Sequence, residues 1–223
     1  DACEALGTTH KGKKVGAIGD VGVFAFYPNK QITTAEGGIL VTNDERIAKL
    51  ARSMRNQGRE EHTSSWLSHE RLGYNYRMSE INAALGLTQI DRIDKIIERR
   101  RKVAEKYNSL LKNIKDIILP YNGEKTDISW FVYVIRLNPS KFLREHRDRL
   151  IAKLKKHGIA CGNYFPPIHL MKFYRETFGY KEGDYPITEK VSETTLALPF
   201  YNNLGQEDIE YICATIRKSL EDI

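Results

Sequence analysis

An apolar run that ends at a proline is the feature that most constrains how this chain can fold. Residues 21–26 are almost all apolar, and Tyr27-Pro28-Asn29 follows them directly. Proline fixes φ and lacks the N–H that a strand ladder needs, so the run predicts a buried strand that stops at Pro28. Together with the Gly-Gly pair and the apolar triplet that follow, residues 1–42 predict short strands and turns.

Lys30 is the chemically notable residue beside this strand. It lies on the loop directly after the predicted strand end, which is where α/β proteins place reactive groups. A lysine in such a place can lose hydration, and desolvation lowers the pKa of an amine enough to make it a nucleophile. From the spacing alone, a solvated loop lysine is the alternative.

Several short motifs occur in the order seen in one family, and they extend over nearly the whole chain. They are DACEALG at residues 1–7, GAIGDVG at 16–22, the Lys30 loop at 24–38, LGYNYRM at 72–78, YFPPIH at 164–169 and LALPF at 196–200. With these motifs the chain resembles the DegT/DnrJ/EryC1/StrS family of pyridoxal-phosphate-dependent sugar aminotransferases.

The resemblance implies an α/β fold of the type I, aspartate aminotransferase-like class. Residues 1–95 would form the later part of the large, cofactor-binding domain, and residues 96–223 the small α/β C-terminal domain. The chain begins at Asp1, inside a motif that relatives carry after a long N-terminal portion. We therefore expect it to be the C-terminal part of a longer protein.

Pyridoxal chemistry needs a lysine amine for the aldehyde, an acid at the pyridine nitrogen and anchors for the phosphate. The resemblance implies that Lys30 is the Schiff-base lysine and proton carrier, and that Asp1 keeps the pyridine nitrogen protonated. It also implies that Glu4 lies near the ring hydroxyl, and that Asn75 reaches across a dimer interface to the neighbour's cofactor phosphate. Taken alone, Asp1 would be a terminal charge and Asn75 a turn residue.

Two positions depart from the family pattern. Glu4 stands where many relatives have His or Gln, and Ala25 stands where many have a serine whose hydroxyl reaches the phosphate. Because alanine cannot donate a hydrogen bond, either another group compensates or the phosphate is held more weakly.

Three further residues are candidates for contact with the substrate. His169 and Tyr164 belong to a small-domain loop that faces the substrate in relatives, and for each a packed or solvent-facing side chain is the alternative. Arg77 either binds an anion or pairs structurally within the Asn75 loop.

Composition narrows the class of protein. With 41% hydrophobic and 29% charged residues, the composition is that of an ordinary globular protein. The chain has no run of 18 apolar residues and no charged-then-apolar leader, so we expect neither a membrane span nor a signal peptide.

The three cysteines, Cys3, Cys161 and Cys213, are far apart and form no C-x-x-C pair. This pattern favours the reducing cytoplasm, without a disulfide framework or a metal site.

The net charge of +6 suits an anionic small molecule such as a nucleotide-linked sugar. A positive net charge is also compatible with nucleic acid as a partner. The basic clusters at residues 11–14 and 99–102 come with no docking motif, and the second is interleaved with acids. Nucleic acid is therefore not favoured as a partner.

Local patterns predict the remaining elements. Three glycines, Gly16, Gly19 and Gly22, have neither dinucleotide-binding nor P-loop spacing, so we interpret them as turn formers. Residues 59–71, with Trp66, are expected to form a mobile loop. The other predictions are a helix through residues 47–54 capped at 43–44, a long helix with Ser79 as N-cap that runs to Ile114 and is broken near 91–94, a covered strand at 128–137, and a shaped loop at 163–167. Three more helices are predicted. The first covers residues 147–157, with an inward apolar stripe of Leu150, Ile151 and Leu154 and with Gly158 as its stop; the second covers 186–195; and the third covers 207–220, with an apolar stripe of Ile209, Ile212, Ile216 and Leu220.

We therefore expect an enzyme that moves an amino group, with glutamate as donor, onto a keto-sugar nucleotide in the biosynthesis of a surface polysaccharide or related glycoconjugate. The resemblance implies a homodimer with shared active sites. One alternative is a catalytically silent C-terminal fragment that acts only as a folded or oligomerising module. Another is a regulatory DNA-binding protein. A dehydratase variant of the family would need His in place of Lys30.

Overall fold

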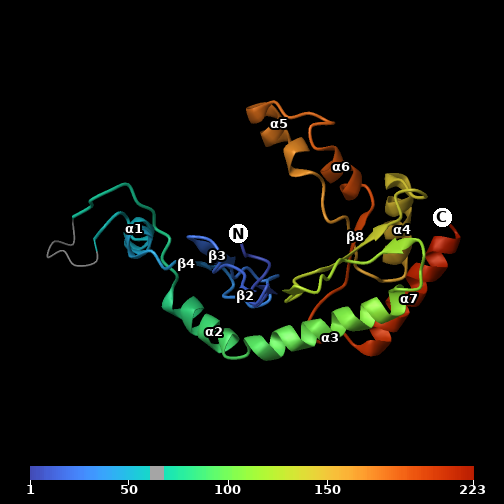
Figure 1. Cartoon of the computed structure of the whole chain (residues 1–223), viewed down its shortest axis with the longest axis horizontal. Helices are drawn as coiled ribbons and strands as arrows, with labels where there is room; N and C mark the ends of the chain where they lie inside the picture. Colours follow the sequence, from blue (N-terminus) through green and yellow to red (C-terminus); the bar gives the residue numbers. More distant parts are fainter. Residues whose placement is uncertain (61–67) are drawn as a thin grey trace. The chain divides into compact units, whose positions relative to one another are not determined.

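The computed structural model describes residues 1–60 and 68–223, and the described chain forms two compact units (Figure 1). The first unit contains residues 1–98 and 122–131, and the second contains residues 99–121 and 132–223. The chain therefore enters the second unit, returns briefly to the first and then completes the second. Whether residue 95 separates two functional domains stays a prediction.

Short antiparallel strands build the first unit. Strands β3 (Gly22–Ala25) and β4 (Gly38–Val41) pair in a hairpin, with Gly22 opposite Val41 and Ala25 opposite Gly38. The predicted strand before Pro28 is confirmed in position, because β3 ends at Ala25, but its residues 23–25 are half-buried and not fully buried as predicted. A second small sheet has the order β2-β1-β6. Its strands are β1 (Thr9–His10), β2 (Lys13–Lys14) and β6 (Thr126–Asp127).

Capped helices follow the hairpin. Helix α1 (Glu45–Arg55) begins at Asp44, whose carboxylate accepts hydrogen bonds from the backbone N–H groups of Arg46 and Ile47, which confirms the predicted cap. Helix α2 (Glu80–Ile90) has Ser79 as its N-cap, also as predicted.

The predicted interruption of the long helix is confirmed as well. Helix α2 ends at Ile90 and helix α3 (Ile93–Leu111) begins three residues later, so a two-residue turn separates them (Figure 1). Residues 61–67, including Trp66 and most of the loop that we expected to be mobile, lie outside the described residues.

An antiparallel sheet with the order β5-β7-β8 forms the centre of the second unit. Its strands are β5 (Ile117–Ile118), β7 (Tyr133–Leu137) and β8 (Thr195–Leu198). Helix α4 (Arg144–Lys156) packs against β8 and against helix α7 (Gln206–Glu221), as Figure 1 shows. Leu150 and Leu154 of α4 and Ile209 and Ile216 of α7 are almost fully buried, which confirms the predicted apolar stripes.

Two predicted boundaries in this half are wrong. The strand predicted from Ile128 to Leu137 begins only at Tyr133, because residues 128–131 leave the strand path and belong to the first unit. Trp130 has a left-handed φ of 50°, which no regular strand contains. The helix predicted at 186–195 is α6 (Pro186–Ser192), since Thr195 already starts β8.

Between α4 and α6 the chain forms the shaped loop that we predicted at 163–167. A 3₁₀ turn, η1 (Ile168–Leu170), and helix α5 (Lys172–Phe178) follow it. Gly158, predicted to stop α4, has a φ of 75° directly after the capping residue His157. Within the part of the chain that is described, no helix is long and apolar enough to cross a membrane.

The close approach of two glycines beside the Lys30 hairpin gives a test of this fold. A Cβ placed on Gly22 would collide with the backbone carbonyl of Gly16, whereas a Cβ on Gly19 would meet its nearest neighbour, the Val21 carbonyl oxygen, at 3.7 Å. Gly22→Ala should therefore lower the free energy of unfolding by about 2 kcal/mol or more. Gly19→Ala, the matched control, should change it little. Urea denaturation followed by circular dichroism measures both, and equal stabilities would contradict the packing.

Candidate active site

Lys30 lies on the turn that closes β3. Its backbone N–H donates to the carbonyl of Tyr27 at 3.0 Å, so the turn forms directly around Pro28. Only 14% of the Lys30 side chain is exposed. The structure thus favours a shielded amine over the alternative of a solvated loop lysine.

Two side chains hold the Lys30 amine. The Nζ atom lies 3.1 Å from Oε1 of Glu4 and 4.4 Å from the ring centroid of Phe131. A carboxylate and an aromatic face both attract an ammonium group, and a cation over an aromatic ring gains about 1 kcal/mol. The sequence did not predict a role for Phe131, because its apolar surroundings indicated only a covered strand.

A buried polar cluster brings these residues together. The Gln31 side chain is 4% exposed, and its Nε2 donates to the Glu4 carbonyl at 2.8 Å and to Oγ of Ser129 at 3.1 Å. The Ser129 N–H donates to Oγ1 of Thr8 at 3.0 Å. The segment from Glu4 to Thr8, the lysine turn and the segment with Ser129 that leads to Phe131 are therefore fixed to one another.

Asp1 is anchored beside the same hairpin. Its carboxylate accepts a hydrogen bond from the Cys3 N–H at 2.8 Å, and the N–H of the buried Ala2 donates to the Val23 carbonyl in β3 at 2.9 Å. Asp1 itself is exposed. Asp1 and Glu4 thus belong to one short segment that packs on the strand leading to Lys30.

These residues fit pyridoxal phosphate by their chemistry. A shielded primary amine suits the aldehyde, and a carboxylate on the adjacent segment suits the pyridine nitrogen. The hydroxyls of Thr33 and Thr34 donate hydrogen bonds to the carbonyls of Phe26 and Glu36, so these two residues shape the lysine loop. Ala25, the last residue of β3, has only a methyl side chain and cannot donate a hydrogen bond to the phosphate.

The loop with Asn75 and Arg77 is fixed by α1. Backbone N–H groups on either side of Asn75 donate to the carbonyls of Met54 and Arg55, and Asn75 is exposed. Nη1 of Arg77 donates to Oδ1 of Asn56 at 3.0 Å. Arg77 is therefore paired structurally, and its contact with an anion stays a prediction.

His169 and Tyr164 lie in the second unit, whereas Lys30 lies in the first. His169 is only 8% exposed, and its Nε2 lies 3.0 Å from Oε1 of Glu189. Its ring centroid is 4.7 Å from that of Tyr185. Hydrogen bonds from the Gly183 N–H and from His169 hold the pKa of Glu189 below its usual value. Glu189 could not be predicted from the sequence, because nothing in its spacing links it to His169.

A cavity of about 780 Å³ lies beside His169. Its lining is mainly apolar and aromatic and includes Tyr164, Phe165, Pro167, Tyr174, Tyr185 and Val191. Direct contact of Tyr164 or His169 with a substrate stays a prediction.

The chain resembles known proteins over nearly its whole length. The family model described as the DegT/DnrJ/EryC1/StrS aminotransferase family matches residues 1–217. GDP-perosamine synthase from Escherichia coli O157:H7 is 35% identical, and the match covers 100% of this chain and 58% of that protein. The spore coat polysaccharide biosynthesis protein SpsC from Bacillus subtilis is 32% identical over 97% of this chain and 58% of that protein.

Solved structures show the same likeness. The putative sugar aminotransferase Spr1654 from Streptococcus pneumoniae, in its PLP form, superposes with a TM-score of 0.91 at 30% identity. That match covers 100% of this chain and 57% of the solved one. The chain therefore spans a little more than half the length of the proteins it matches.

The contact between Phe131 and Lys30 can be tested without cofactor or substrate. Phe131→Leu removes the aromatic face, so an amine-directed reagent should label Lys30 about fivefold faster, the factor that corresponds to about 1 kcal/mol. Phe131→Tyr keeps the face and should label at the wild-type rate. Peptide mass spectrometry gives the rates, and Lys49, whose side chain is 67% exposed, is the internal standard. Equal Lys30 labelling in the Leu and Tyr variants would show that the ring does not hold the amine.

Proposed function

The chain belongs to the DegT/DnrJ/EryC1/StrS aminotransferase family, and we propose that it acts as a pyridoxal-phosphate-dependent sugar-nucleotide aminotransferase. Its α/β fold is that of the type I pyridoxal-phosphate-dependent transferases: the later part of the large domain followed by the small C-terminal domain. The observation that carries the proposal is the shielded Lys30 amine, 3.1 Å from Glu4 on the segment that begins with Asp1.

Each residue of the site has a distinct role in this proposal. When bound, pyridoxal phosphate supplies an electron sink for the carbon that loses or gains the amino group. Lys30 holds the cofactor through Nζ and moves a proton at the reacting carbon. Asp1 holds a proton on the pyridine nitrogen, and Glu4 orients Nζ.

The proposed reaction moves an amino group from an amino acid, with glutamate as the donor, to a keto-sugar nucleotide. The products are a 2-oxo acid and an amino-sugar nucleotide. A relative named for GDP-perosamine synthesis and another named for spore coat polysaccharide biosynthesis support this substrate class. The net charge of +6 favours binding of the substrate's diphosphate.

We further propose a homodimer in which each copy completes the other's site. Helix α2 is rich in apolar residues, yet none of them is buried: Ile81 is 83% exposed and Leu87 68%. A second copy that covers this face would remove a large apolar surface from water. Asn75 is exposed on the loop that leads into α2, and there it would reach the phosphate held by the partner.

A reducing compartment fits the same proposal. Cys3, Cys161 and Cys213 are all free thiols, and burial raises the pKa of the Cys213 thiol to about 12. We therefore propose that the enzyme works in the cytoplasm.

Covalent capture of the cofactor tests the central residue. After incubation with pyridoxal phosphate and reduction with borohydride, the peptide that contains Lys30 should carry the added mass. Lys30→Ala protein should carry none there, because the amine is gone. Lys49, on the exposed surface, reports non-specific capture. Modification of Lys49 without modification of Lys30 would refute the assignment and favour a catalytically silent chain.

Mixing two inactive variants tests the shared site. If Lys30 of one copy works with Asn75 of the other, a dimer of one Lys30→Ala and one Asn75→Ala subunit contains one intact site. Random exchange of subunits should then restore about a quarter of the wild-type sites. Formation of the 2-oxo acid from glutamate in the presence of a keto-sugar nucleotide measures the recovery. A mixture as inactive as its components would contradict sharing.

A further inference from the structure

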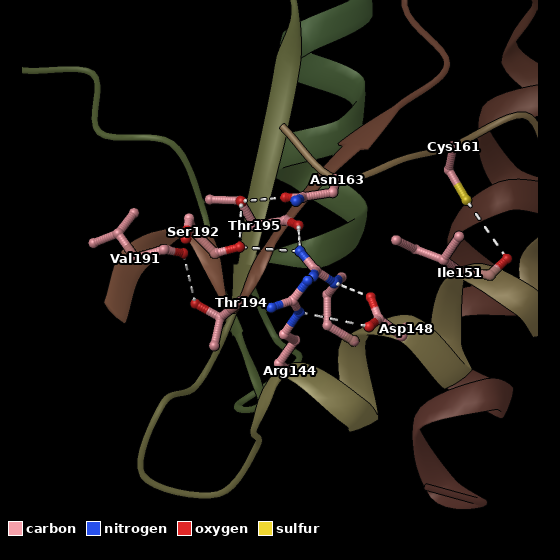
Figure 2. A network of polar contacts seen from close by, with 10 residues as sticks. Arg144, Asp148, Ile151, Cys161, Asn163, Val191, Ser192, Thr194 and Thr195 are labelled. Carbon is pink, nitrogen blue, oxygen red and sulfur yellow. Dashed lines mark hydrogen bonds and ion pairs between the residues drawn. The ribbon is translucent and has the colours of Figure 1, made fainter. Parts of the chain in front are cut away.

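The loop at residues 163–169 is fixed at both ends, while its middle is left accessible. At the first end, Oγ1 of Thr195 donates to Oδ1 of Asn163 at 3.2 Å, as Figure 2 shows. Backbone hydrogen bonds between Gly162 and Ala197 continue this attachment to β8. In the middle of the loop, Phe165 is 47% exposed.

At the other end, Glu189 holds the loop through His169. A carboxylate only accepts hydrogen bonds, so Nε2 of His169 is the donor in their 3.0 Å contact. Three backbone contacts fix the carboxylate itself. The Gly183 N–H lies 3.0 and 2.9 Å from its two oxygens, and the Tyr185 N–H lies 3.2 Å from Oε1. Glu189 is therefore a fixed point against which the histidine is placed.

Both attachments share one rigid support. The Arg147 side chain is 2% exposed, and its Nη1 donates to the carbonyls of Ser192 at 3.0 Å and Thr195 at 3.3 Å. Ser192 ends α6, the helix that carries Glu189, and Thr195 is the partner of Asn163. Figure 2 shows Ser192, Thr195 and Asn163 together beside Asp148, which accepts a 2.6 Å hydrogen bond from Arg147. Helix α4 thus anchors both ends of the loop.

We propose that Glu189 is a positioning residue that acts through His169 to set the loop at 163–169 for the keto-sugar nucleotide. This inference rests on the proposed function and assigns a role to a residue outside the cofactor site. Tyr164 and Phe165 lie between the two fixed ends and line the cavity beside His169. Their aromatic faces suit the apolar face of a sugar ring or a nucleobase. His169, which is 8% exposed, lines the same cavity.

The two half-reactions distinguish this role from a general effect on the enzyme. In the first, glutamate gives up its amino group and leaves as the 2-oxo acid. In the second, the keto-sugar nucleotide takes up the amino group. Glu189→Gln removes the charge that receives the His169 hydrogen bond, so KM for the keto-sugar nucleotide should rise about tenfold. The first half-reaction should keep its wild-type rate.

The matched control is Glu193→Gln, an exposed glutamate at the end of the same helix. It removes the same charge and should change neither half-reaction. His169→Gln should resemble Glu189→Gln, and the double variant should be no worse than the worse single one, because the two residues act in series. Additive losses, or an equal fall in both half-reactions, would overturn the positioning role.

A second measurement needs no substrate. Amide hydrogen exchange in residues 162–171 should be faster in Glu189→Gln than in wild type and unchanged in Glu193→Gln. Unchanged exchange in Glu189→Gln overturns the inference by itself.

The kinetic experiment uses a panel of GDP-, UDP- and TDP-linked keto-sugars with the wild-type protein. If the wild type accepts an amino group from glutamate but passes it to none of them, the proposed substrate class fails, and this inference fails with it.

Discussion

The hydrogen bonds of Gln31 are the interaction on which the candidate site depends. The buried amide reaches both the Glu4 carbonyl and Ser129, and so it joins the acidic segment at the start of the chain to a segment more than a hundred residues later. An unpaired buried amide would cost about 1–3 kcal/mol, so this arrangement is held strongly once formed. It brings Phe131 to the lysine and makes residues 122–131 part of the first unit.

The same buried cluster explains which elements could not be predicted from the sequence. Helix starts at Asp44 and Ser79 and the stop at Gly158 could be predicted, because each depends on hydrogen bonds or backbone angles within a few residues. The strand at 128–137 was predicted too long. Its apolar run is a local signal, whereas the bond between Ser129 and Thr8 joins distant parts of the chain and outweighs the local preference.

The residues of the candidate site also fall into two groups: those expected from the sequence and those that only the structure reveals. The family resemblance pointed to Lys30, Asp1 and Glu4. The structure shows that two of them, Lys30 and Glu4, form a 3.1 Å ion pair on the turn that follows Pro28. Phe131 and Glu189 were missed, since an aromatic residue in an apolar run and an acid on a short helix carry no signal by themselves. Both become visible only when a partner is seen, the Lys30 amine for one and the His169 ring for the other.

Lys30 and His169 illustrate two ways to place a side chain in a loop without regular structure. Lys30 is held at its tip, by a carboxylate and an aromatic face, so the amine is restrained but can exchange partners. His169 is held by a carboxylate whose own position is set by backbone N–H groups, so the ring has one geometry. The first arrangement suits a group that must form and break bonds, and the second suits a group that must keep others in place. This contrast supports the proposed roles: reaction chemistry for Lys30, and positioning for His169 and Glu189.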